Sequence, residues 1–103
     1  MKKNQIENEI LNDEIKIFGK DELEKNPKIK FNENDKIKIL SKGNPKRNNK
    51  NSFENFELYH DGISIKEYSE KFLESEGNIQ KKLKNPISWI KWDISKGFIG
   101  IIE

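Results

Sequence analysis

The strongest constraint on the fold is the helix punctuation in the second half of the chain. Ser64 and Glu67 stand at capping-box spacing, and a hydrophobic staple is available where Ile63 precedes the box. This pattern predicts a helix over residues 65–74 that ends near Gly77. The apolar stripe of that helix consists of Ile65, Tyr68 and Phe72.

Two further helices carry similar start and stop signals. A helix over 53–59 can be capped by Asn51 or Ser52, and Gly62 can close it in the left-handed conformation. A helix over 87–96 begins after Asn-Pro and ends at Lys-Gly. The alternating pattern of 88–94 also permits a strand paired with 98–102, but the Asn-Pro and Lys-Gly signals favour the helix.

The first half of the chain instead alternates apolar and polar residues. This pattern predicts strands over 14–18, 28–31 and 36–40, the last two forming a hairpin, and the apolar run 98–102 predicts a buried strand. We therefore expect one α+β domain over 1–103, with a small mainly antiparallel sheet packed by about three helices. The polar segment 1–13 is compatible with either a short helix or a flexible end.

Composition excludes several classes of protein. The chain has no cysteine, so a disulfide framework and a thiolate metal site are both impossible. No apolar run approaches the roughly 18 residues of a membrane span, and no signal-like segment follows the lysines near the start. We expect a cytoplasmic protein that has no membrane partner.

Positive charge is concentrated in one stretch of the sequence. Six basic and no acidic residues occur between Lys36 and Lys50, although the whole chain carries a net charge of only +2. Within this stretch, residues 41–51 form a loop by composition, and such a loop can bind phosphates, with Arg47 able to make bidentate contacts. The predicted binding residues of the loop are Lys42, Asn44, Lys46, Arg47 and Lys50.

A second candidate binding region surrounds the two tryptophans. On a helix over 87–96 they lie nearly opposite its isoleucines, so one is expected to pack in the core and one to remain exposed. Aromatic rings beside cations are typical of proteins that bind RNA or single-stranded DNA. The predicted binding residues here are Trp89, Lys91 and Trp92, within a basic set that also includes Lys81, Lys82, Lys84 and Lys96.

No sequence pattern supports catalysis. His60 is the only histidine and adjoins Asp61, but its position after a helix favours a structural role, and no nucleophile motif accompanies it. The carboxylates of the 65–74 helix follow helical spacing on a surface stripe, with Lys66 and Lys71 as partners. We expect no enzymatic activity, no cofactor and no metal.

Several short motifs together resemble a group of small bacterial and phage proteins without an assigned activity. Those proteins have an NPKR loop, a Y..G.(T/S)(V/I).EY segment and a WD...G(F/Y)I ending. The corresponding residues here are Asn44 to Arg47, Tyr59 to Tyr68 and Trp92 to Ile99, and the similarity covers residues 43–102. The resemblance implies a shared fold and a mobile-element setting, and it transfers no catalytic residue.

This setting is similar to that of anti-CRISPR proteins. The leading hypothesis is a phage or mobile-element protein that binds and inhibits a nucleic-acid-processing complex of its host through the basic and aromatic residues. The alternative is a direct DNA- or RNA-binding regulator built like a winged-helix module.

Overall fold

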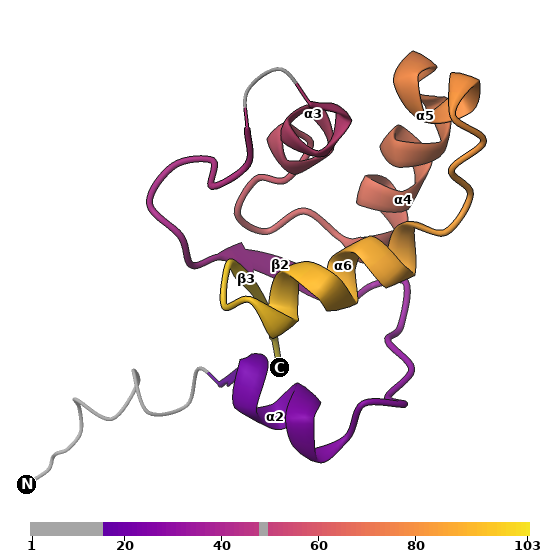
Figure 1. Cartoon of the computed structure of the whole chain (residues 1–103). Helices are drawn as coiled ribbons and strands as arrows, with labels where there is room; N and C mark the ends of the chain where they lie inside the picture. Colours follow the sequence, from indigo (N-terminus) through magenta and orange to yellow (C-terminus); the bar gives the residue numbers. More distant parts are fainter. Residues whose placement is uncertain (1–15, 48–49) are drawn as a thin grey trace, which may run out of the picture.

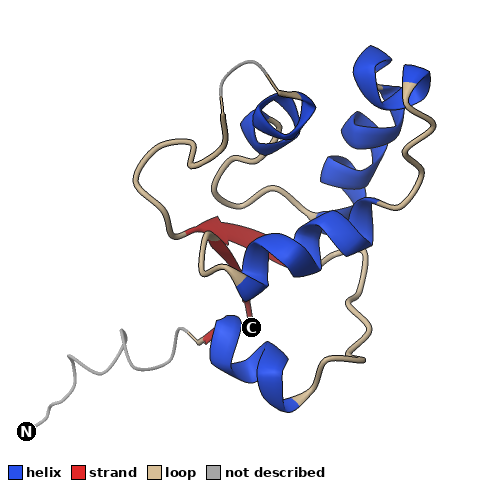
Figure 2. Cartoon of the chain, in the orientation of Figure 1, coloured by secondary structure: helices blue, strands red, loops and turns tan. Residues whose placement is uncertain are grey.

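The last strand of the chain lies at the centre of the sheet. A computed structural model describes residues 16–47 and 50–103, in which β1 (Ile17–Phe18), β2 (Lys36–Ile39) and β3 (Ile99–Ile102) form a three-stranded antiparallel sheet in the order β1-β3-β2. Figure 1 shows α6 (Pro86–Ser95) crossing in front of this sheet. The other helices of the described residues are α2 (Lys20–Lys25), α3 (Asn51–Glu57), α4 (Ile65–Glu74) and α5 (Glu76–Gln80). The predicted α+β class is confirmed, as the distribution of helices and strands in Figure 2 shows.

The apolar sequence of β3 explains its central place. Ile101 pairs with Phe18 of β1 on one side and with Ile37 of β2 on the other. A strand flanked on both edges and covered by helices is buried, and Ile99, Gly100 and Ile101 are all buried. The predicted strands over 36–40 and 98–102 are therefore confirmed to within one residue at each end.

The helix caps predicted from sequence are formed. The hydroxyl of Ser64 accepts a hydrogen bond from the backbone N–H of Glu67 (3.0 Å), and α4 has the predicted bounds. The side chain of Asn85 accepts a hydrogen bond from the backbone N–H of Ser88 (3.2 Å) at the start of α6. Gly97 ends α6 with a φ of 78°. The helix, and not the alternative hairpin, is therefore the structure of this segment.

Residues 28–31 do not form the predicted strand, and the predicted hairpin is wrong. One edge of β2 pairs with β3, and on its other edge the backbone N–H of Ile37 donates to the carbonyl of Ile63 (2.9 Å). No edge of β2 is left for residues 28–31. The ring of Phe31 nevertheless packs edge-on against Phe18, with ring centres 5.5 Å apart. The apolar side chains of this segment face the core without sheet pairing.

Two other predictions differ in their limits. The helix predicted over 53–59 spans 51–57 in the structure, and its N-cap residue Lys50 makes no side-chain capping bond. The strand predicted over 14–18 is seen at 17–18, while its first two residues and the segment 1–13 lie outside the described residues. In the part of the chain that the structure describes, no helix is long and apolar enough to span a membrane.

A pair of buried asparagines joins α3 to α5 and was not predicted from sequence. Asn55 and Asn78 exchange two amide hydrogen bonds, of 3.0 and 2.7 Å, and Asn78 also donates to the carbonyl of Phe72 (2.8 Å). Asn51, one of the two residues expected to cap α3, instead donates its side-chain amide to Asn78 (2.6 Å). These bonds satisfy polar groups that are excluded from water.

Replacing Gly100 by alanine should lower the free energy of unfolding by about 1–3 kcal/mol, because overpacking strains a filled core. A Cβ atom at Gly100 would collide with the side chain of Ile17 and would lie 3.1 Å from the carbonyl oxygen of Phe18. Urea denaturation followed by circular dichroism measures the change. In Gly19→Ala, the control, the added Cβ would make only an ordinary 3.6 Å contact with Glu22. Equal stabilities for the two variants would contradict the close pairing of β1 with β3.

Candidate functional site

Lys46 is not a free surface charge, which corrects the prediction that it contacts phosphate. Its Nζ lies 2.8 Å from Oδ1 of Asp93 in α6, and the two side chains are only 11% and 2% exposed. The same ammonium group lies 5.6 Å from the ring centre of Phe98 and 6.0 Å from that of Phe56. A charge buried this deeply requires an opposite charge beside it. Lys46 therefore anchors the basic loop to α6.

Asn44, another predicted binding residue of the loop, makes several structural contacts within the chain. Its side-chain amide donates to the carbonyl of Phe53 (3.0 Å) and to a carboxylate oxygen of Glu57 (2.8 Å). Its side-chain oxygen accepts a hydrogen bond from the backbone N–H of Lys46 (2.9 Å). Together, Asn44 and Lys46 tie residues 44–46 of the loop to α3 and α6.

The other three predicted residues of the loop, Lys42, Arg47 and Lys50, are exposed. None of them forms an ion pair with an acid among residues 16–47 and 50–103. The backbone N–H of Lys50 donates to the carbonyl of Arg47 (3.1 Å). The loop therefore presents three cations to solvent from an anchored backbone.

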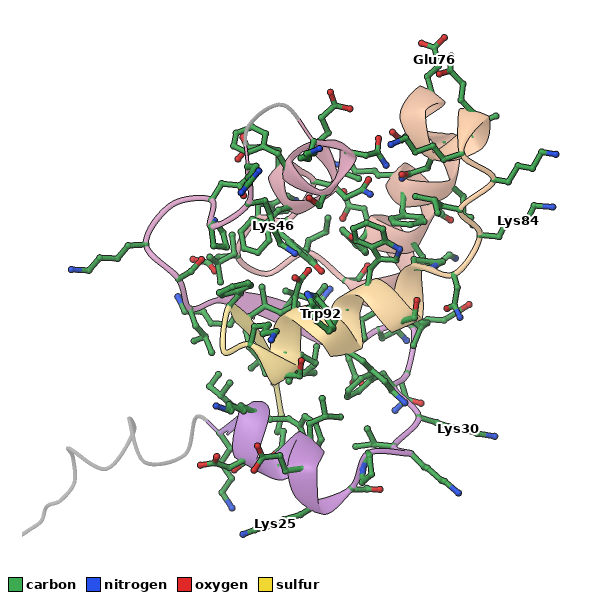
Figure 3. The ribbon with its side chains drawn as sticks, viewed as in Figure 1. Lys25, Lys30, Lys46, Glu76, Lys84 and Trp92 are labelled. Carbon is green, nitrogen blue, oxygen red and sulfur yellow. The ribbon has the colours of Figure 1, made fainter. Side chains whose placement is uncertain are left out.

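The two tryptophans have different surroundings, as the sequence predicted. Trp89 is partly buried against the core, and its ring centre lies 5.7 Å from that of Phe72. Trp92 is 55% exposed, and Nζ of Lys96 lies 4.6 Å from its ring centre. Such a distance is within the range of a cation–π contact. Trp92 is therefore the exposed aromatic residue of α6, and Figure 3 shows it on the front of that helix.

A groove of about 480 Å³ joins the tryptophans to the basic loop. We call it the tryptophan groove, and its lining residues are Lys46, Ser52, Ser88, Trp89 and Trp92. The groove combines aromatic surface with two hydroxyl groups and is bordered by the loop that carries Arg47 and Lys50. The structure thus brings the two candidate binding regions of the sequence together.

Lys91 does not belong to this groove, which corrects its prediction as a residue of the same surface. Its side chain lies on another flank of α6 and donates to the carbonyl of Pro27 (3.2 Å). Lys82 and Lys84 also lie elsewhere, beside a hollow lined by α4 and α5 residues. Of the basic residues named around the tryptophans, Lys96 is the one in contact with Trp92.

Asp93 also accepts a hydrogen bond from the hydroxyl of Tyr59 (2.7 Å), so one buried carboxylate serves both a cation and a phenol. The ring of Tyr59 is stacked on that of Tyr68, with centres 4.4 Å apart. Burial raises the pKa of both tyrosines, and the neighbouring charge of Asp93 adds to the shift. Sequence analysis missed this cluster, although an acid on the apolar face of a helix signals a buried partner.

The two tyrosines are the only ones in the chain, which makes their ionisation easy to follow. The native state keeps both phenols protonated above the ordinary tyrosine pKa of about 10, whereas the unfolded state releases these protons. Stability should therefore fall as the pH rises above this value. We expect tyrosinate absorbance to appear together with the loss of helical circular dichroism. Tyrosinate formation in a protein that remains folded would contradict the burial of these rings.

The described residues show no arrangement typical of a catalytic centre. Among residues 16–47 and 50–103, no group of three or more His, Asp or Glu side chains could hold a metal ion. His60 is exposed, and its Nδ1 lies 3.3 Å from the carbonyl oxygen of Asp61. Asp61 itself accepts from the backbone N–H of Ile39 (2.7 Å) and pairs with Lys38 (3.2 Å), contacts that lower its carboxyl pKa. These contacts join the turn after α3 to β2.

Comparison with known proteins gives no match. No protein-family model, no curated protein and no solved structure is significantly similar to this chain.

Proposed function

We propose that this protein is a non-enzymatic binding protein of a phage or other mobile element, which acts in the cytoplasm by attaching to a nucleic-acid-processing complex of its host. In this proposal it inhibits that complex as anti-CRISPR proteins do. The observation that carries the proposal is the 55% exposure of Trp92 beside an anchored loop whose cations point to solvent. Exposed tryptophan and arginine side chains are the residues that most often dominate binding energy at protein interfaces.

The groove gives this interface a defined shape. Trp92 would bury its ring against the partner, while Arg47 and Lys50 would meet carboxylates or phosphates around it. Because Asn44 and Lys46 already hold residues 44–46 in place, little backbone entropy is lost in that part of the loop when it binds. The same surface is suited to the acidic or nucleic-acid-lined channels of such complexes.

The test is a cleavage assay with purified CRISPR effector complexes. Wild-type protein should be retained by an immobilised effector complex and should slow target cleavage. Trp92→Ser and Arg47→Glu should each weaken retention by about tenfold or more, the size expected for hot-spot residues. Lys71→Ala is the matched control, since Lys71 is exposed on α4 beside Glu67. The proposal would be contradicted if the protein were not retained by any effector class and did not slow cleavage by any of them.

A second candidate function is direct binding of single-stranded nucleic acid. The observation that favours it is the cation–π contact of Lys96 with the exposed ring of Trp92, on which a base could stack. Binding of labelled RNA and DNA oligonucleotides should then be measurable at low salt and weaken steeply as salt rises. Arg47→Ala should reduce the slope of log K against log[salt] by about 1. No binding at low salt would eliminate this function and leave a protein partner.

A further inference from the structure

A second groove follows another flank of α6 and plays no part in the proposed function. It consists of three adjoining hollows of about 520, 360 and 630 Å³. The first two hollows share Phe31 and Ile87, and the last two share Leu73. We call these three adjoining hollows together the lysine groove. It runs from residues 27–31, past the start of α6, to α4 and α5.

The floor of the lysine groove is apolar and accessible. Leu73 is 47% exposed and Ile79 is 59% exposed. Of the four large apolar side chains that are exposed among the described residues, these two lie in the groove. Exposed apolar side chains gathered in a groove with a polar rim are typical of an interaction site. The apolar lining residues include Ile29, Phe31, Leu73, Ile79, Leu83 and Ile87.

The rim of the groove is mainly basic. Its lysines are Lys28, Lys30, Lys66, Lys82, Lys84 and Lys91, and its acids are Glu33 and Glu70. None of these lysines forms an ion pair with an acid among the residues that the structure describes. In Figure 3, Lys30 and Lys84 extend outward on the same side of the molecule. The charge of the rim therefore selects an acidic partner.

Lys82, on this rim, has an uncommon backbone conformation. It is the one non-glycine residue with a positive φ, 59°, in the described residues. The backbone N–H of Lys82 donates to the carbonyl of Ile79 (3.1 Å), and the backbone N–H of Leu83 donates to the carbonyl of Asn78 (2.9 Å). This pair of bonds is typical of a helix end at which the residue after the C-cap is usually glycine. A lysine at this position accepts backbone strain that a glycine would avoid. Its charge at the groove offers a reason for that strain.

We propose that the lysine groove binds an acidic amphipathic helix of a partner protein. Apolar side chains on one face of the helix would contact the floor, and its carboxylates would pair with the lysines of the rim. An anionic membrane fits less well, because the floor is concave and Glu33 and Glu70 lie in its lining. Nucleic acid also fits less well, since Phe31 is the only aromatic residue in the lining.

The test is a titration of the full chain, labelled with ¹⁵N, with a synthetic helix of leucines at i, i+3, i+4 and i+7 spacing and glutamates elsewhere. Amide shifts should change at Leu73, Ile79 and Leu83 and not at Trp92. Ile79→Ser should weaken binding about tenfold, because its side chain loses apolar contact. Lys82→Gly should weaken it about two- to fivefold while leaving the fold equally or more stable. Lys71→Ala is the matched charge control.

Several results would overturn this inference. They are no shift change at a millimolar concentration of the peptide, changes confined to the tryptophan groove, equal binding of a peptide with lysine in place of every glutamate, and unchanged affinity of Lys82→Gly. Displacement of the peptide by anionic lipid vesicles would also overturn it and assign the groove to a membrane surface. These results concern binding of the peptide and not retention by an effector complex, so the proposed function is tested separately.

Discussion

Asp93→Ala should lower the free energy of unfolding by about 3–5 kcal/mol, the loss expected when one partner of a buried ion pair is removed. The ammonium group of Lys46 would remain in a side chain that is only 11% exposed, without the carboxylate 2.8 Å away. The hydroxyl of Tyr59 would lose its acceptor as well. Both losses fall where the basic loop meets α6, so the variant should also lose the shape of the tryptophan groove. Chemical denaturation measures the change.

A double-mutant cycle separates the ion pair from the tyrosine bond. Asp93→Asn keeps an acceptor for Tyr59 but removes the charge, and Lys46→Met removes the cation but keeps the length of the side chain. The double variant should lose clearly less stability than the sum of the single losses, because neither charge is then left unpaired. Glu67→Gln removes one charge of an exposed ion pair, in which Nζ of Lys71 lies 3.7 Å from a carboxylate oxygen of Glu67. This variant should change the free energy of unfolding by less than about 0.5 kcal/mol. Additive losses at Lys46 and Asp93 would show that the two do not interact.

Asn78→Ala should lower the free energy of unfolding by about 2–4 kcal/mol, because each buried polar group left unpaired costs about 1–3 kcal/mol. Asn78 is fully buried and is the acceptor or donor in four hydrogen bonds, to Asn51, Asn55 and Phe72. Its loss should release α5 from α3 and α4. Hydrogen exchange should then increase first in residues 76–83.

The exposed residue Asn34 provides the control for this prediction. Asn34→Ala removes an amide of the same size from a solvent-exposed turn, and it should change stability by less than about 0.5 kcal/mol. If Asn78→Ala were as stable as Asn34→Ala, the amide bonds between α3 and α5 would not contribute to the fold.

Capping residues in the sequence correctly predicted the helices whose ends are fixed by hydrogen bonds to nearby residues. The caps at Ser64 and Asn85 lie within three residues of the groups they bind, so the bounds of α4 and the helical state of α6 could be predicted from sequence. The alternation at 28–31 failed as a strand signal for a different reason. Strand pairing depends on which edge is free, and the edge of β2 is taken by residues 62–65, which no local pattern indicates.

The candidate site was predictable in its exposed part and not in its buried part. The sequence indicated a basic loop and, elsewhere in the chain, one exposed tryptophan out of two. In the structure Arg47 and Trp92 are both exposed. The sequence could not distinguish Lys46 from the lysines around it, because only the fold brings Asp93 from 47 residues away to the same point. The charge of the loop therefore has two roles, in which one lysine holds the loop in place and its neighbours face solvent.

Hydroxyl-radical footprinting with mass spectrometry tests the binding surface most directly, since it separates Trp92 from the tryptophans of any partner. In the free protein Trp92 should be oxidised several times faster than Trp89. Adding the purified effector complex that retains the protein should reduce the oxidation of Trp92. In a parallel labelling with an acetylating reagent, the complex should also reduce the acetylation of Lys42 and Lys50, while that of Lys71 is unchanged. Unchanged reactivity of Trp92 and of both loop lysines in the complex would show that the partner binds elsewhere and that the tryptophan groove is not the functional surface.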